Sequence, residues 1–222
     1  MNPVAGVLSE VGGSGLLIVV LGLGNPGGEY ADTRHNVGFM VVDRLAADCN
    51  VKFSRPSGGL VSTKAVIRSK DVLIAKPVTF MNKSGVGAKR ALGEAGIDLR
   101  PDGDSGSEDD LKEVLDISDK VIVVVDDCDL PFGAMRLRKG GGSGGQKGIK
   151  SIVEWLGTDK FSRLRIGVGR PAKSSADGLA DYVLSPFDKD EEESLEEELK
   201  RGVLAIERFV EEGIEAAMNT FN

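Results

Sequence analysis

Short apolar runs rich in β-branched residues recur along this chain of 222 residues, and each is bounded by Gly, Pro, Asp or Asn. Runs of this kind are typical of buried strands. The predicted strands are 16–21, 60–68, 71–75, 121–125 and 164–168. Because the second and third runs adjoin closely, they predict a hairpin, and the sheet should therefore be mixed rather than all parallel.

Between these runs, apolar residues recur at spacings of three and four, which predicts helices at 36–48, 84–95 and 146–156. Strands that alternate with helices are typical of a three-layer α/β/α sandwich with one core. At the C-terminal end, the same spacing predicts one long amphipathic helix over 188–218 with an acidic first turn, which complements the helix dipole. Its apolar positions are Leu195, Leu199, Val203, Ile206, Val210 and Ile214.

Two segments do not fit a packed core. Residues 98–118 contain the sequence DGDSGSEDD and are interpreted as an acidic surface insertion. Residues 1–15 hold no Arg or Lys, so they resemble neither a secretory leader nor a transit peptide, and we expect a flexible N-terminal tail before a single domain at 16–222. The longest apolar run, 16–23, is too short to cross a bilayer, so no membrane anchor is expected.

Charge is distributed unevenly along the chain. The net charge is −7, which alone argues against a polyanionic partner, yet the stretch from Arg136 to Lys173 carries a formal +8. The acidic residues that outweigh it lie mainly in 104–119 and 188–198. The sequence therefore predicts a basic face on an acidic protein, suited to binding phosphates.

The glycine-rich segment 22–27 formally matches the G-x-G-x-x-G fingerprint of dinucleotide-binding proteins. That match is weak, because Pro26, Gly27 and Gly28 break the helix that should follow, and no acidic residue ends a second strand about twenty positions on. The run 140–148 likewise departs from a phosphate-binding loop. A dinucleotide-dependent oxidoreductase is therefore only the weakest alternative.

His35 is the only histidine in the chain, and histidine is the side chain whose unperturbed pKa suits proton transfer near neutral pH. It follows the glycine-rich turn at the end of the first predicted strand, where open α/β sheets bind ligands. Asp126, Asp127 and Asp129 end another strand. One of these carboxylates is expected to reach the imidazole, fix its tautomer and raise its basicity.

The sequence offers no serine or cysteine in a nucleophile elbow of the Gly-x-Ser-x-Gly type outside the glycine-rich run. A histidine that activates water is therefore favoured over a covalent intermediate. Such a hydrolysis needs donors for a developing oxyanion, and Asn25, Asn36 and Asn82 are candidate amides. The two cysteines match neither a metal pair nor a redox motif and indicate a reducing compartment.

Several motifs then appear in a fixed order: GLGNPG at 22–27, TRHNVG at 33–38, KPVTFMNKSG at 76–85, DDCDLPFG at 126–133 and RLRIGVGRP at 163–171. From about residue 17 to 187, the chain resembles the bacterial-type peptidyl-tRNA hydrolase family. The resemblance implies a phosphorylase/hydrolase-like fold, a monomer, no metal or organic cofactor, and peptidyl-tRNA as the partner. It also implies a cytoplasmic enzyme, or a mitochondrial or plastid one if the source is eukaryotic.

The resemblance also implies roles for individual residues. His35 matches the general base, Asp126 matches the carboxylate that keeps this base able to accept a proton, and Asn25 matches the amide that distinguishes a blocked aminoacyl group from a free one. The remaining matches are to residues that contact tRNA. Around the tRNA 3′ end they are Tyr30, Phe80 and Asn82, and at the clamp for the 5′-phosphate they are Arg138 and Arg165.

The chain departs from the family at 145–148, where it has Gly-Gln-Lys-Gly in place of the common Gly-His-Asn-Gly. Gln146 still offers an amide, and Lys147 is expected to stabilise negative charge or contact a phosphate of the substrate. The departure keeps a non-catalytic alternative open, because relatives of the family, the chloroplast group II intron splicing factors, use this fold as an RNA-binding scaffold.

Overall fold

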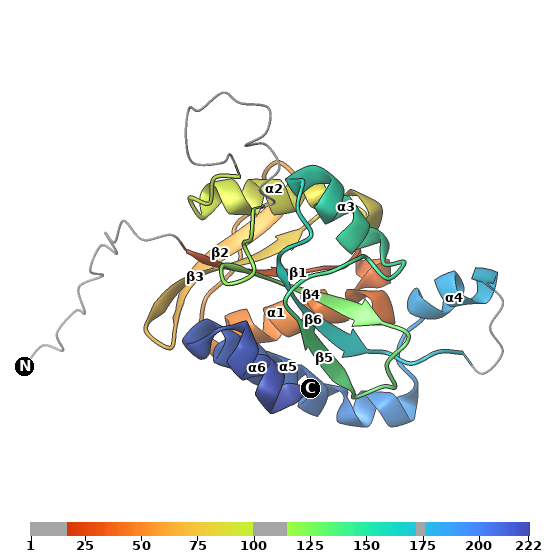
Figure 1. Cartoon of the computed structure of the whole chain (residues 1–222). Coiled ribbons are helices and arrows are strands. Elements are labelled where there is room, and N and C mark those ends of the chain that lie inside the picture. The colour runs from red at the N-terminus through yellow and green to blue at the C-terminus, as the bar shows by residue number, and fades with distance from the viewer. Residues whose placement is uncertain (1–16, 100–114, 172–175) are drawn as a thin grey trace, which may run out of the picture.

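Six strands form one mixed sheet at the centre of the molecule, in the order β2-β3-β1-β4-β6-β5 (Figure 1). The computed structural model describes residues 17–99, 115–171 and 176–222. The strands are β1 (Ile18–Gly22), β2 (Leu60–Ile67), β3 (Lys70–Pro77), β4 (Val121–Asp127), β5 (Met135–Arg138) and β6 (Ser162–Gly167). The four central strands are parallel, whereas β2 and β5 run antiparallel at the two edges. The predicted hairpin is β2–β3.

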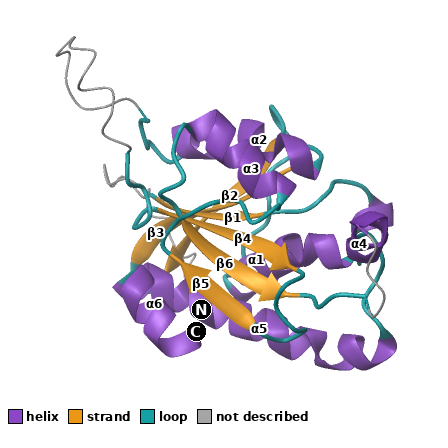
Figure 2. Cartoon of the chain, turned by 45° about the vertical axis from the view of Figure 1, so that its right-hand side comes forward, coloured by secondary structure: helices purple, strands orange, loops and turns teal. Residues whose placement is uncertain are grey.

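Helices cover both faces of this sheet (Figure 2). The helices are α1 (Val37–Asp48), α2 (Ser84–Glu94), α3 (Lys147–Leu156), α4 (Ala176–Val183), α5 (Lys189–Glu212) and α6 (Ile214–Phe221). Successive strand residues point to opposite faces, so Val19 and Leu21 pack with α2 and α3, while Ile18 and Val20 pack with α1, α5 and α6. The predicted three-layer α/β/α sandwich is confirmed.

The prediction of one C-terminal helix over 188–218 is wrong. α5 ends at Glu212, and Gly213 adopts a φ of 89°, a left-handed conformation that favours glycine and ends the helix. The chain continues as α6, which packs against β5. The apolar spacing continues across the break, which is why the pattern predicted a single helix.

Two elements were not predicted. β5 has only four residues, and two of them are exposed arginines, so its alternation is too short to stand out. α4 lies beyond the carboxyl ends of β4 and β6 (Figure 1).

The predicted acidic insertion at 98–118 lies mostly outside the described residues, as does the predicted N-terminal tail at 1–15. The end of the insertion belongs to the core, because Ile117 and Ser118 are buried and the Ser118 carbonyl accepts a hydrogen bond from the Ser162 hydroxyl at 2.7 Å. Among the helices of the described ranges, none is long and apolar enough to cross a membrane.

Candidate active site

The candidate site lies at the carboxyl ends of β1 and β4, where parallel strands of an open sheet direct their following loops to one edge. The loop after β1 leads into two short 3₁₀ turns, Gly28–Tyr30 and Arg34–Asn36, instead of the helix that a dinucleotide site requires. α1 then begins close to the strands. A Cβ at Gly38 would lie 2.4 Å from the carbonyl oxygen of Val124, so only glycine permits this approach, which brings His35 over the end of β4.

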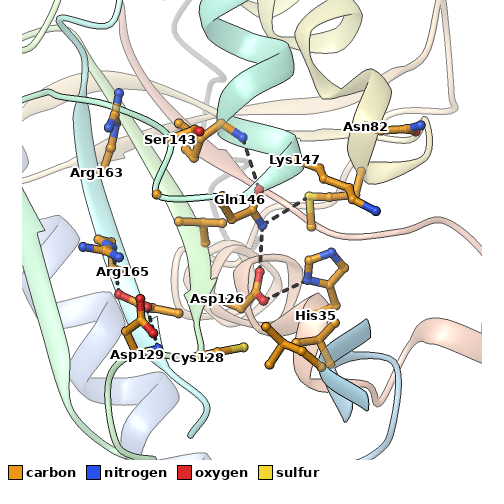
Figure 3. Close-up of a pocket in the computed structure, with 18 of the residues that line it drawn as sticks. His35, Asn82, Asp126, Cys128, Asp129, Ser143, Gln146, Lys147, Arg163 and Arg165 are labelled. Atoms are coloured by element: carbon orange, nitrogen blue, oxygen red, sulfur yellow. Dashed lines mark hydrogen bonds and ion pairs between the residues drawn. The ribbon is translucent and has the colours of Figure 1, made fainter. Parts of the chain in front are cut away.

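His35 and Asp126 form the expected pair. The imidazole Nδ1 lies 2.8 Å from Asp126 Oδ2, and the two side chains are 15% and 4% exposed. A buried carboxylate in this position accepts the proton of Nδ1, which leaves Nε2 as the basic nitrogen. Within the part of the chain that the structure describes, Nε2 has no hydrogen-bond partner. The arrangement therefore presents an oriented proton acceptor (Figure 3).

A second donor reaches the same carboxylate. Gln146 Nε2 donates to Asp126 Oδ1 at 2.9 Å, while the Gln146 side-chain oxygen caps the first turn of α3. Figure 3 shows Gln146 above Asp126 and His35 beside it. The sequence offered Gln146 only as an available amide. The signal that indicated more was its position at the very start of the helix predicted over 146–156, where a side-chain acceptor is needed.

Asn25 is held by a separate network. Its backbone N–H and C=O bond the side-chain amide of Asn36 at 2.7 and 2.9 Å. The side-chain oxygen of Asn25 accepts the backbone N–H of Met81 at 2.8 Å. Its Nδ2 group is therefore the end of the amide that remains to bind a substrate. Asn36, also a candidate from the sequence, is buried and positions Asn25 instead of lining the pocket.

Nine of the residues that the sequence and the resemblance put forward as catalytic or binding line one cavity of about 940 Å³, whereas Asn36 does not. They come from segments far apart in the chain: Asn25, Tyr30, His35, Phe80, Asn82, Asp126, Arg138, Lys147 and Arg165. Apolar residues of α4 and of the turn after it complete the wall, namely Leu179, Ala180, Val183 and Leu184. The cavity thus combines a polar centre with an apolar side, as sites for extended substrates do.

The strand-end carboxylates have separate partners. Asp127 pairs with Arg165 at 2.7 Å, and Asp129 pairs with Arg170. Figure 3 shows Arg165 on the other side of Asp126 from His35. Arg138 is exposed and has no ion pair with any residue in the described ranges. The cavity therefore has a basic end, and the Asp127 carboxylate of β4 neutralises part of its positive charge.

Arg163, which also lines the cavity, has a structural role. It is buried, donates to the carbonyl oxygens of Gly142 and Asp159 at 2.7 and 3.2 Å, and lies 4.6 Å from the ring centre of Phe161. Burial lowers the pKa of its guanidinium. These bonds hold the glycine-rich loop that precedes Gln146.

Arg34, the neighbour of His35, ties the site to α4 and α5. Its guanidinium is 1% exposed, lies 4.3 Å from the centre of the Tyr182 ring, and bonds the Pro186 carbonyl and the Glu191 carboxylate. Its backbone N–H also donates to Ser185 at 3.0 Å. The 3₁₀ turn that carries His35 and the wall formed by α4 are therefore joined through one buried cation. Nothing in the sequence indicated this role, because its partners lie about 150 residues further on.

Cys128 lines the cavity but is not a plausible nucleophile. Burial, with the nearby Asp126 and Asp127 carboxylates, raises its pKa to about 12, so it remains a protonated thiol at neutral pH. Among the described residues, no cluster of three or more His, Cys, Asp or Glu side chains is arranged to hold a metal ion.

Comparison with known proteins gives a consistent result. A family model described as peptidyl-tRNA hydrolase matches residues 19–101 and 106–222. Proteins of that name from Aquifex aeolicus and Bacillus subtilis are 42% and 40% identical, covering 92% and 93% of this chain and 95% and 98% of theirs. The crystal structure of peptidyl-tRNA hydrolase from Acinetobacter baumannii superposes with a TM-score of 0.78 at 28% identity, covering 95% of this chain and 97% of that one.

Proposed function

The chain belongs to the peptidyl-tRNA hydrolase family and hydrolyses the ester that joins a peptide to tRNA, and from this premise we propose the parts that its pocket residues play. The observation that carries the proposal is the His35–Asp126 pair, with Nδ1 bonded to a buried carboxylate and Nε2 open to the cavity. The scaffold and oxidoreductase alternatives do not account for such an arrangement.

In the proposed mechanism, His35 Nε2 takes a proton from water as the water oxygen attacks the ester carbonyl. Asp126 holds the other nitrogen in its N–H form and stabilises the imidazolium that develops. Water supplies the oxygen of the new carboxyl group, and the ester oxygen leaves on the 3′-terminal ribose. The proton on Nε2 then passes to that oxygen, which restores the base.

Asn25 is proposed to select blocked substrates. Because its Oδ1 already accepts the Met81 N–H, the group that it presents to the cavity is a donor. A donor can bond the carbonyl oxygen of a peptide link. A free α-ammonium group is itself a donor, so it would remain unpaired and repelled at this position. The substrate with a peptide attached is therefore preferred over free aminoacyl-tRNA.

The remaining pocket residues are proposed to bind the tRNA. Phe80 is 57% exposed, and Tyr30 lines the same cavity, so both rings are available to stack on bases of the single-stranded 3′ end. Asn82 and Lys147 are exposed polar residues that line the same cavity, and they are proposed to hold the ribose and phosphate of the terminal nucleotide at the tRNA 3′ end. Arg138 and Arg165, at the basic end, are proposed to bind the 5′-phosphate.

We also propose that the protein acts as a monomer in the cytoplasm. The cavity is built from residues of one chain, so no partner subunit is needed to complete it. Peptidyl-tRNA, its substrate, is released where translation aborts, and a cytoplasmic location would place the enzyme together with this substrate.

The test is His35→Ala, assayed with N-acetyl-aminoacyl-tRNA. General-base assistance is worth about 10² to 10⁴ in rate, so we expect kcat to fall about a hundredfold or more. tRNA affinity, measured by filter binding, should remain nearly unchanged, because the imidazole is not among the proposed tRNA contacts. Turnover equal to that of the unmodified protein would rule out His35 as the base.

A further inference from the structure

Gln146 stands between α3 and the active-site carboxylate, and the mechanism above does not use it. Its side-chain oxygen accepts the backbone N–H groups of Gly148 and, at 3.2 Å, of Ile149. These donors decide which end of the amide is oxygen, because an NH₂ group cannot accept a hydrogen bond from them. The nitrogen therefore faces Asp126, 2.9 Å from Oδ1.

Both oxygens of Asp126 are consequently occupied. Oδ2 bonds His35 and Oδ1 bonds Gln146, and the carboxylate is 4% exposed. A buried carboxylate with one donor on each oxygen cannot rotate without losing a hydrogen bond to a charged group. The direction from which Asp126 meets the imidazole is thus set by Gln146 as well as by β4.

Gln146 is itself held by close packing at the start of α3. A Cβ at Gly148 would lie 2.5 Å from the sulfur of Met81 and 2.8 Å from a methyl carbon of Leu23, so the first turn of the helix lies directly against the loop after β1 and the turn after β3. The Gln146 nitrogen also lies 3.7 Å from the Met81 sulfur. The donor is therefore presented by a rigid helix end and not by a mobile surface side chain.

We propose that Gln146 is a positioning residue, which orients the Asp126 carboxylate toward His35 by donating a hydrogen bond from a side chain that α3 holds in place. This inference rests on the proposed function, because Gln146 has such a role only if His35 and Asp126 act as a pair. An amide does not titrate, so the support that it gives to Asp126 does not change with pH.

The charged groups that surround the pair come from β4, the turn after β3, α3 and the basic end of the cavity. Asp127 and Asp129 are each paired with an arginine. The charged side chains that line the cavity together with the pair are Lys83, Asp127, Asp129, Arg138, Lys147, Arg163, Arg165 and Arg170.

The first test is Gln146→Ser. Serine is among the best N-cap residues, so this variant keeps α3 capped, but its side chain is too short to reach Asp126. We expect kcat to fall about tenfold, while KM for N-acetyl-aminoacyl-tRNA changes less than about twofold. Thermal unfolding should show that the variant is folded. Glu154→Ala, on the exposed face of the same helix, is the matched control and should leave kcat unchanged.

The second test is Gln146→Glu, which keeps the shape and the acceptor for α3 but replaces the donor with a second carboxylate. Added negative charge beside Asp126 favours the protonated imidazole, which cannot act as a base. We expect the acid limb of the kcat profile to move to higher pH, with activity recovering as pH rises. A residue that only caps α3 would change thermal stability and leave this profile in place.

The outcomes separate the possibilities. Unmodified kcat in Gln146→Ser, an unshifted profile in Gln146→Glu, or a loss confined to KM overturns the positioning role, and the last result would assign Gln146 to substrate binding. His35→Ala is assayed in parallel. If it is inactive while Gln146→Ser is fully active, only the role of Gln146 is refuted; if both are fully active, the proposed base is refuted.

Discussion

The two ends of the cavity are built differently. At one end, His35 and Asp126 are mostly buried and bonded to each other at 2.8 Å. At the other end, Arg138 is exposed, and Arg165 is 32% exposed and shares its charge with Asp127. The strength of a buried hydrogen bond depends on the exact positions of its donor and acceptor. Exposed charges attract a ligand over a longer range, and salt screens this attraction beyond about 8 to 10 Å. Changes at the first end should therefore affect kcat, and changes at the second should affect affinity.

The largest effect is expected from Asp126→Asn. Gln146 would still donate to the side-chain oxygen of the substituted residue, so the new NH₂ group would face His35. Nδ1 must then become the acceptor, and the proton moves to Nε2, which can no longer take one from water. We expect kcat to fall about 10³-fold or more, with tRNA affinity in filter binding little changed. A loss of less than about tenfold would contradict the assignment of Asp126.

A smaller effect, on selectivity, is expected from Asn25→Asp. One oxygen would still accept the Met81 N–H, but the other would present an acceptor where the protein now presents a donor. The ratio of kcat/KM for N-acetyl-aminoacyl-tRNA to that for free aminoacyl-tRNA should fall about a hundredfold. Both substrates are measured with the same tRNA. Equal losses on both would show that Asn25 does not read the blocked amine.

The smallest effect is expected at the arginine end. Arg138→Ala should weaken tRNA binding several-fold and reduce the slope of log affinity against log salt by about one, with kcat at saturation unchanged. Arg165→Gln should have less effect, because Asp127 already neutralises part of its charge. Arg136→Ala is the matched control, since Arg136 is exposed on the same face of β5 but does not line the cavity. If the slope of log affinity against log salt in Arg138→Ala and Arg165→Gln equals that in the control Arg136→Ala, there is no phosphate site at this end.

The sequence predicted the layers well because they depend on local periodicity. Strands such as β4, with seven buried residues, and helices such as α3 have patterns that extend over their whole length. β5 was missed because four residues hold too little alternation, and Gly213 was missed as a helix end because the apolar spacing continues past it. Apolar periodicity reports neither the pairing of a short edge strand with its neighbour nor the left-handed backbone conformation of a single glycine.

The site was predictable to the extent that it depends on strand ends. His35 is the only histidine and follows β1, and the carboxylates follow β4, so topology alone brings them to one edge. What could not be predicted is which oxygen bonds which donor. Gln146 reaches Asp126 only because the start of α3 packs against Met81, and Arg165 pairs with Asp127 across neighbouring strands.

The side chain of Asn222 binds the outer backbone of β5, where its amide accepts the Leu137 N–H at 2.7 Å and donates to the Leu137 carbonyl at 3.2 Å. β5 is an edge strand, and unpaired edge groups invite another strand to add to the sheet. The Asn222 amide makes the two hydrogen bonds that an added strand would make with Leu137, so these two backbone groups of β5 are already paired. The same two bonds anchor Leu137, the residue next to Arg138, so Asn222 helps to fix the backbone that carries the arginine proposed to bind the 5′-phosphate.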